Sequence, residues 1–293
     1  MRSPSKGLTI IVTVVLVFIC TFDFSLLRGL VWDLFSSKIK KNFQLDIDFK
    51  SSSVSGLGFE LKDVSLRPNH FPFDLTLNTL NFNCPVNILW GNLSKCQILF
   101  SINQGAGKLI FTDRNNLSGD IKAVEISKFA FLSAHNIESG ILHIADLKLN
   151  IDQKFTHLAA KLKLVNFLKT KPSNLAPSVT GLPLTLKLDP ININNAHADI
   201  KFTWDIQSKQ TRELLIDQIE MTSDMGSISE SSSIYFSLHK LQKLDIYFNP
   251  SAAGLNAIKP FAQFVCPAES LSIATPLRFS LIGHQLSCQI ATN

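Results

Sequence analysis

Charged residues are scarce in this chain of 293 residues: they make up 17% of it, against 45% hydrophobic residues. Such a chain is too apolar to remain disordered, because disorder requires low hydrophobicity and high net charge. Tyrosine and tryptophan are also rare, with 2 and 3 residues against 22 phenylalanines. This balance favours apolar faces whose rings need no hydrogen-bonding partner. Length does not separate one domain from two, because all-β domains of this size exist as single units.

Concentrated positive charge is missing as well. The net charge is +5, and most lysines stand singly among Asp, Asn and Ser. A nucleic-acid-binding surface gathers Lys and Arg on one stripe beside stacking aromatic residues, so nucleic acid is not expected as a partner. The local cluster of Lys38, Lys40 and Lys41 follows the apolar N-terminus. It either contacts anionic lipid headgroups or forms a solvated helix end.

Motifs of catalysis and cofactor binding are absent. The chain contains neither GxxxxGK[ST] nor GxGxxG, and the nearest approach, Gly105-Ala106-Gly107, lies between strand-like segments. It has no GxSxG or HExxH motif, and its His residues stand apart from Cys and carboxylate clusters. Acidic residues on the strands, namely Asp146, Asp152, Asp199 and Asp205, are predicted to lie on solvated outer faces. We expect no catalytic residue, no cofactor and no metal, and therefore a protein that is not an enzyme.

The N-terminus carries the longest uncharged run, Leu8–Phe22, preceded by Arg2 and Lys6. At ~1.5 Å per residue the run reaches about 22 Å, less than a hydrocarbon core of ~30 Å, so its length also fits a cleavable signal peptide. No small-x-small cleavage pattern follows, and 24–35 continues the apolar character. A retained membrane anchor is therefore favoured over cleavage and over a buried core helix. The positive-inside rule places the amino end in the cytoplasm, although Arg28 and the lysine cluster compete on the other side.

From Leu45 onward the dominant period is two, the spacing at which side chains alternate between the faces of a strand. Leu182, Leu184, Leu186 and Leu188 alternate with Pro and polar residues, and 198–206 shows the same pattern. It recurs at 45–49, 73–77, 96–102, 158–164, 234–238, 244–248 and 277–281. Each of these segments predicts a strand with one apolar and one wet face.

The alternation slips by one residue in several places, as between Leu77 and Leu80 and between Leu188 and Ile191. A slip would move the apolar residues to the other face unless the chain bulges or turns. We therefore predict bends or bulges at 78–79 and at 189–190. Pro190, which cannot donate a hydrogen bond to a neighbouring strand, supports the second break.

Helix signals after residue 41 are short, at 86–92 and 256–264, and cannot cross over a parallel sheet repeatedly. The strands are therefore expected to be mainly antiparallel. A Pro-rich linker is predicted at 169–181 and a polar loop at 226–233. Such strands either close into a sandwich or barrel or form a curved open sheet whose concave apolar face stays available. An exposed apolar groove marks a partner, ligand or lipid site.

The chain has five cysteines. Cys20 lies in the apolar N-terminal segment as a small apolar residue. The others form two local pairs, Cys84 with Cys96 and Cys266 with Cys288, in a compartment expected to be oxidising. Four cysteines allow three connectivities. The local pairing and free buried thiols are the alternatives.

Residues 58–92 contain G-x-x-L-x-x-V-x-L (Gly58, Leu61, Val64, Leu66), an alternating segment, and then Pro85, Ile88, Leu89 and Gly91. This unit resembles one shared by AsmA-like periplasmic proteins and the type II secretion system protein N family. A glycine-bearing hairpin at 105–111 and TGLPLTLKLD at 180–189 extend the resemblance, which covers roughly 8–290. The glycine that follows the G-L-P-L strand in the family is missing here, and Ala106 separates the hairpin glycines.

The resemblance implies a non-enzymatic accessory component of type II secretion that touches other envelope proteins. The alternative is an AsmA-like lipid-handling protein between the two membranes of a bacterium. Both imply residues 1–41 as cytoplasmic stub, inner-membrane anchor and juxtamembrane helix, and 42–293 as a periplasmic twisted β-groove, with a secondary boundary at 169–181. Membrane lipid and envelope proteins are the expected partners. The residues predicted to line the groove are Phe73, Leu75, Leu77, Ile98, Phe100, Leu184, Leu186, Ile200, Phe202, Trp204, Phe236 and Phe248.

Overall fold

The structure, a computed structural model, describes residues 45–55, 58–68, 75–83, 94–113, 115–129, 137–152, 154–170, 173–175, 186–188, 191–205, 207–208, 210–238, 240–263, 265–267, 275–282 and 285–291. The strands of its large sheet are β1 (Leu45–Ser55), β2 (Gly58–Pro68), β3 (Leu75–Asn83), β4 (Gln97–Ile102), β5 (Gly105–Phe111), β6 (Asn116–Glu125), β7 (Ile137–Ile151), β8 (Phe155–Lys169), β11 (Ile191–Asp205), β12 (Gln210–Ser223), β13 (Gly226–Ser237), β14 (Lys240–Pro250), β15 (Leu277–Ile282) and β16 (Gln285–Ile290). The small sheet joins β9 (Ser173–Leu175) and β10 (Leu186–Leu188), and the helices are α4 (Ala252–Ala262) and the 3₁₀-helix η2 (Ile126–Lys128).

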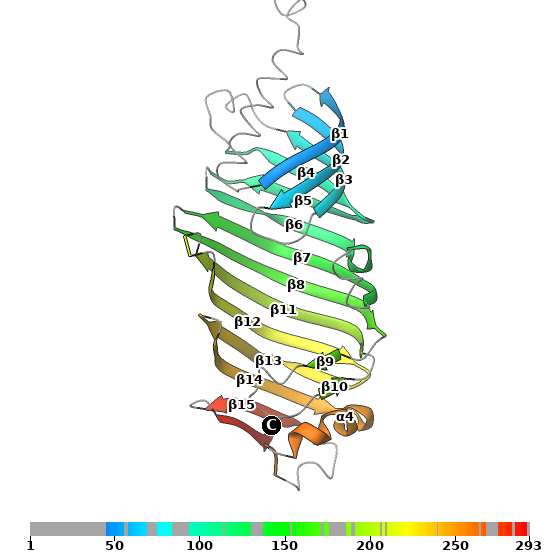
Figure 1. Cartoon of the computed structure of the whole chain (residues 1–293), viewed down its shortest axis with the longest axis vertical. Coiled ribbons are helices and arrows are strands. Elements are labelled where there is room, and N and C mark those ends of the chain that lie inside the picture. The colour runs from blue at the N-terminus through cyan, green and yellow to red at the C-terminus, as the bar shows by residue number, and fades with distance from the viewer. Residues whose placement is uncertain are drawn as a thin grey trace, which may run out of the picture.

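The large sheet has 14 strands, and its ladders are antiparallel throughout. Each strand pairs with the next one along the chain, except that β8 pairs with β11 and leaves β9 and β10 to the small sheet (Figure 1). The sheet begins at β1 and ends at β16, which do not pair with each other. The predicted mainly antiparallel β fold is therefore confirmed, in its open form and not as a closed barrel.

The two faces of the sheet differ in chemistry. Residues paired directly across neighbouring strands point to the same face, so each face can be followed from strand to strand. One row is apolar from β5 to β14: Phe111, Leu117, Leu149, Leu158, Phe202, Leu214, Phe236 and Leu241. Another is apolar from β6 to β16: Val124, Leu142, Leu164, Ala196, Met221, Ile228, Phe248, Leu277 and Ile290. We call this the apolar face, and we call the opposite one, which carries charged side chains such as Lys161, the polar face.

The apolar face stays continuous because the strands change the face of their side chains where the alternation slips. Asp63 on β2 and Asn78 on β3 both lie outside the ladder, between the pairs Val64–Leu77 and Leu61–Leu80. All four of these paired side chains are buried. Leu77 and Leu80 thus both reach the buried side, as the bend or bulge predicted at 78–79 requires, while the register of β2 and β3 is the same before and after it. Asp63 has a positive φ of 51°, and positive φ angles of 50° to 56° mark similar irregularities in other strands, at Ala123, Asp146, Asn166 and Gln218.

Other local predictions differ from the structure. The polar segment 226–233 is not a loop but part of β13, because β12 and β14 pair with it on both sides. The predicted linker contains β9, and the helix expected at 256–264 is α4, which begins at Ala252. β10 ends at Leu188 and β11 begins at Ile191, while 189–190 and the helix predicted at 86–92 lie outside the described residues.

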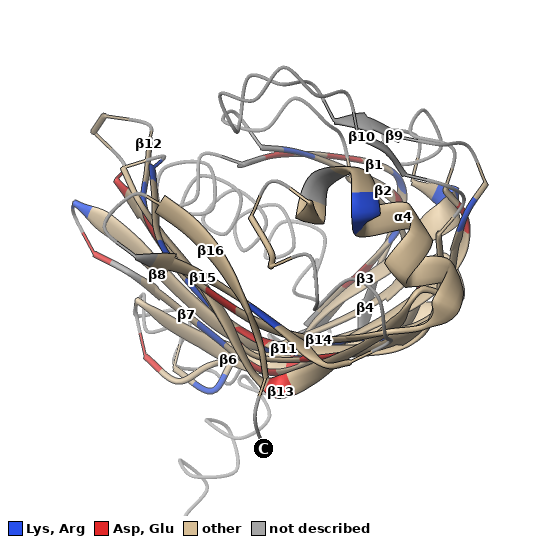
Figure 2. Cartoon of the chain, turned by 90° about the horizontal axis from the view of Figure 1, so that it is seen from below, with Lys and Arg blue, Asp and Glu red and all other residues tan. Residues whose placement is uncertain are grey.

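Figure 2 shows that the sheet curves into a trough, with α4 lying on its inner side. α4 packs through Leu255 and Ile258 against the buried residues Leu277 and Cys288, which belong to β15 and β16. Leu277 lies in an apolar row, so the apolar face is the concave one. No helix among the described residues has both the length and the apolarity needed to cross a bilayer. The N-terminal segment predicted as an anchor lies outside those residues.

Candidate functional site

The concave face changes character along the sheet. From β8 to β14 its large apolar side chains are only half-buried. We call this region the apolar trough, and we define it by the following residues: Leu158, Leu162, Leu164, Ile200, Phe202, Trp204, Leu214, Ile216, Ile234, Phe236, Leu244, Ile246 and Phe248. These residues come from five strands that are neighbours in the sheet. The trough is therefore a property of the strand register and not of any one segment.

Most of the predicted groove residues lie on this face, but they divide into two groups. Ile200, Phe202, Trp204, Phe236 and Phe248 line the apolar trough, where the rings of Phe202 and Trp204 are stacked with centroids 6.1 Å apart. Leu75, Leu77, Ile98 and Phe100 lie on the same face near its N-terminal end.

Three predicted groove residues are not found on the large sheet among the described residues. Phe73 and Leu184 fall outside the described residues. The structure places Leu186 in β10, which belongs to the small sheet and not to the large one. The reason is that β8 pairs directly with β11. The segment between them in the sequence, which contains β9 and β10, is therefore not part of the large sheet.

The N-terminal end of the concave face is filled by the protein's own side chains. Leu61, Val64 and Leu77 are 1%, 0% and 2% exposed, and the rings of Phe59 and Phe82 stack with centroids 4.9 Å apart. The Phe100 ring lies over Gly107, where a Cβ atom would overlap it. These contacts make a packed core from β2 to β6, so this part of the predicted groove is closed.

The C-terminal end of the concave face is covered by α4. A disulfide between Cys266, which follows the helix, and Cys288 on β16 ties this segment to the sheet. Gly254 in α4 lies against the β12–β13 turn, where a Cβ atom would overlap the carbonyl oxygen of Met225. Cys96 is also disulfide-bonded, but its partner and the predicted partner Cys84 lie outside the described residues. The trough is thus bounded by packed structure at both ends.

Sequence reasoning missed one polar group on the concave apolar face. Ser232 on β13 is paired with Ile219 and is fully buried, and its hydroxyl accepts a hydrogen bond from the Tyr247 backbone N–H at 2.9 Å. The hydroxyl satisfies a backbone donor where β13 bulges relative to β14. The serine-rich sequence carries no signal for this, because the same composition is typical of a solvated turn.

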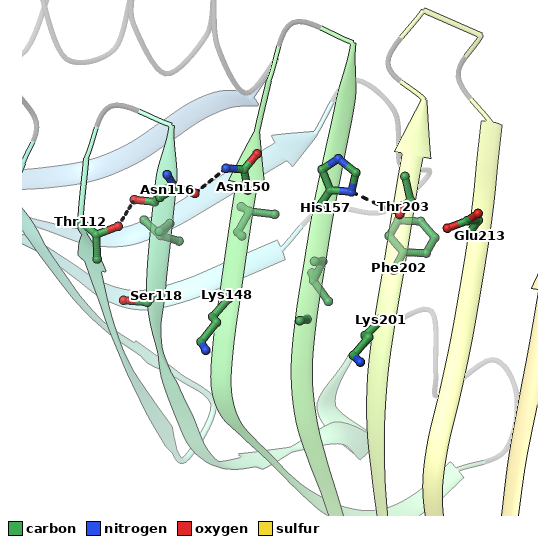
Figure 3. A pocket seen from close by; sticks show the side chains of 14 residues that line it. Thr112, Asn116, Ser118, Lys148, Asn150, His157, Lys201, Phe202, Thr203 and Glu213 are labelled. Atoms are coloured by element: carbon green, nitrogen blue, oxygen red, sulfur yellow. Dashed lines mark hydrogen bonds between the residues drawn. The ribbon is translucent and has the colours of Figure 1, made fainter.

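A second depression, of ≈ 610 Å³ (Figure 3), is lined by residues of the polar face together with Leu117, Leu149, Leu158 and Phe202 of the apolar row. We call it the polar pocket. Its polar side chains come from β6, β7, β8, β11, β12 and the residue after β5: Thr112, Asn116, Ser118, Lys148, Asn150, His157, Lys201, Thr203 and Glu213. Asn150 Nδ2 donates to Asn116 Oδ1 at 2.5 Å, and His157 Nδ1 lies 3.3 Å from Thr203 Oγ1.

Acidic residues near the strand ends have structural partners. Backbone N–H groups of Phe155 and Lys154 donate to Asp152 and lower its pKa. Asp205 differs from the solvated residue predicted, because it is 6% exposed. Its carboxylate accepts hydrogen bonds from the N–H groups of Ser208 and Gln207, which lower its pKa. Both carboxylates stabilise hairpin turns.

No cluster of three or more His, Cys, Asp or Glu side chains suited to a metal ion occurs in the part of the chain that the structure describes. Comparisons of this chain with family models, curated proteins and solved structures find no match.

Proposed function

We propose that this protein is a non-enzymatic envelope protein that holds the acyl chains of membrane lipids in its apolar trough. The observation that carries the proposal is the half-buried state of a continuous apolar surface over β8 to β14, between two ends that are packed shut. The largest apolar patch of a soluble monomer covers ~300–600 Å² and is itself often functional. A concave surface of Phe, Leu and Ile from five neighbouring strands matches a ligand or partner site.

The chemistry of the surface favours an acyl chain over a protein segment. The side chains that define the trough carry no hydrogen-bonding group except the Trp204 indole, and the buried Ser232 hydroxyl already accepts from Tyr247. An extended peptide would bring backbone N–H and C=O groups that lose water without gaining partners, and each such loss costs roughly 1–3 kcal/mol. An acyl chain brings no such group.

The location expected for this function is the bacterial inner membrane, with the sheet in the periplasm. The uncharged run 8–22 supports a single anchor. The disulfide between Cys266 and Cys288 supports an oxidising compartment. An anchored trough of this kind would shield lipid chains from water next to the membrane that supplies them.

A second candidate is an accessory component of type II secretion that contacts other envelope proteins. The packed core from β2 to β6 favours it, because a scaffold fills its interior with its own side chains, as Leu61, Val64 and Leu77 do here. The resemblance of 58–92 to the protein N family supports the same role. Under this candidate the apolar trough would remain empty of lipid.

The test is photolabelling of the full-length chain with a palmitate analogue that carries a diazirine on its acyl chain. Labelled peptides are identified by mass spectrometry. We expect labels on β8 to β14, and a several-fold loss of labelling in the variant Phe202→Ser/Phe236→Ser. Leu99→Ser is the control, because Leu99 is 40% exposed on β4 and pairs with Lys108, away from the trough. Labels confined to 1–41, or equal labelling of all variants, would contradict lipid binding in the trough.

A further inference from the structure

The polar pocket contains two lysines that bracket a small residue. Lys148 on β7 and Lys201 on β11 are each paired directly with Ala159 on β8. Neighbouring strands lie ~4.8 Å apart, so the two lysine Cα atoms are roughly 10 Å apart with the Ala159 methyl group between them. Figure 3 shows the two side chains on the strands either side of β8. The short alanine leaves the space between the lysine stems open.

Neither ammonium group has a counter-ion among the described residues. Lys161, the next residue on this face of β8, pairs with Asp146 at 3.2 Å. In the described part of the chain, neither Lys148 nor Lys201 lies within ion-pair distance of a carboxylate. Glu213, the acidic residue among those that line the pocket, accepts a hydrogen bond from the Tyr235 hydroxyl at 3.4 Å. Among the lining residues, two lysines therefore stand against one carboxylate, so the lining carries net positive charge. Asp199, two residues from Lys201 on the same face of β11, is the cross-strand neighbour of Lys161.

Neutral polar groups surround the charged pair. Asn150 lies two residues from Lys148 on β7, and Thr203 lies two residues from Lys201 on β11. His157 stands between them on β8 and contacts Thr203. Amide, hydroxyl and imidazole groups at this edge can donate to an anion held between the two ammonium groups.

We propose that the polar pocket binds a phosphate ester group between Lys148 and Lys201, over Ala159. A phosphate ester presents several strong acceptor oxygens, and a monoester carries a charge of about −1.5 to −2 at pH 7, which two lysines match. Either a lipid headgroup or a small soluble phosphate supplies this chemistry. Lys148, Ala159 and Lys201 pair with one another on the polar face, so the proposed site does not depend on acyl chains binding in the apolar trough.

The test measures binding to the full-length chain by isothermal titration calorimetry. The probes are inorganic phosphate, glycerol 3-phosphate and dihexanoylphosphatidylglycerol below its micelle concentration. We expect saturable binding of at least one probe, weakened at least ~10-fold in Lys148→Ala/Lys201→Ala. Lys108→Ala/Lys122→Ala is the charge-matched control, because these exposed lysines lie on the polar face of β5 and β6 outside the pocket. Tighter binding of the lipid probe identifies a headgroup, and tighter binding of the other two identifies a soluble ligand.

A charge-neutral variant separates a built pocket from general attraction. Ala159→Leu fills the space between the lysines without changing net charge and is expected to weaken binding several-fold. Ala106→Leu, at an exposed position beside Lys122, is expected to leave it unchanged. Absence of saturable binding of every probe, or equal binding by Lys148→Ala/Lys201→Ala and the lysine control, would overturn the proposal. Equal binding by Ala159→Leu and the wild type would overturn the position over Ala159.

Discussion

At the scale of single residues, close contact between two backbone segments determines which residue type can stand at position 254. Gly254 is buried in the first turn of α4, and the first residues of this helix contact the β12–β13 turn, where the Ser251 N–H donates to the Met225 carbonyl at 3.0 Å. The Ser251 hydroxyl in turn accepts from the Gly254 N–H at 3.0 Å and so caps the helix. Glycine is required here by space, because the helix lies directly on another backbone.

Gly254→Ala tests this requirement by the sign of its effect on the free energy of unfolding. Helix propensity alone predicts a gain of about 1 kcal/mol in the free energy of unfolding. Overlap with Met225 predicts a loss of about 1–3 kcal/mol instead, because overpacking forces backbone shifts. Denaturant unfolding measures the difference, with Asn256→Ala at an exposed position of the same helix as the control. A stabilised Gly254→Ala would show that α4 does not lie as tightly on the turn as described.

At the scale of elements, the disulfide ties the segment after α4 to the edge of the sheet. Cys266 and Cys288 are 22 residues apart, and closing a loop of this length stabilises a fold by about 3 kcal/mol in the chain-entropy description. We expect Cys266→Ser/Cys288→Ser to lower the unfolding free energy by about this amount, and α4 to become sensitive to limited proteolysis. The single variant Cys266→Ser removes the same bond and should behave alike. Unchanged proteolysis of α4 would show that packing on Leu277 alone holds it.

How well an element can be predicted from sequence depends on whether its own residue pattern or its pairing with other strands determines it. The slip between Leu77 and Leu80 is local, and it predicted a bulge at Asn78 because apolar residues on both sides must reach one face. The segment 226–233 was predicted wrongly as a loop. Its serines and Glu230 are typical of a turn, yet pairing with β12 and β14 holds it as a strand. The composition of the segment itself does not show that both neighbouring strands pair with it.

The site was predictable to the same limited extent. Alternation identified Ile200, Phe202, Phe236 and Phe248 as residues of an apolar face. It could not show that Leu77 and Ile98 on the same face are buried while Phe202 remains half-buried, because that difference arises from how tightly distant strands pack. The pairing of Lys148 and Lys201 with Ala159 depends on the register of three strands, and isolated lysines in the sequence do not reveal it.

At the scale of the whole molecule, stability is unevenly distributed. Fully buried apolar side chains concentrate in β2 to β6. In the described part of β8 to β14, by contrast, Ala160 is the only buried hydrophobic residue. Local stability follows the density of buried apolar contacts. One continuous sheet therefore joins a firmly packed region to one that is held mainly by its backbone hydrogen bonds.

Hydrogen exchange of the full-length chain tests this difference. We expect amides of β2 and β3 to exchange more slowly than those of β12 and β13, and the latter to slow when palmitate is added. Equal protection of the two regions without ligand would contradict the unequal distribution of stability.

The bulges in β6 and β7 limit which single-residue insertions and deletions these strands can accept during evolution. Asp146 adds one residue to β7 relative to β6, and Ala123 adds one to β6, so the register between Asn116–Asn150 and Val124–Leu142 is restored. Deleting either residue alone would offset one end of both strands against the other by a full position. Descendants of this sequence would therefore gain or lose such residues in compensating pairs, and single-residue gaps between relatives should fall in hairpin turns instead of inside these strands.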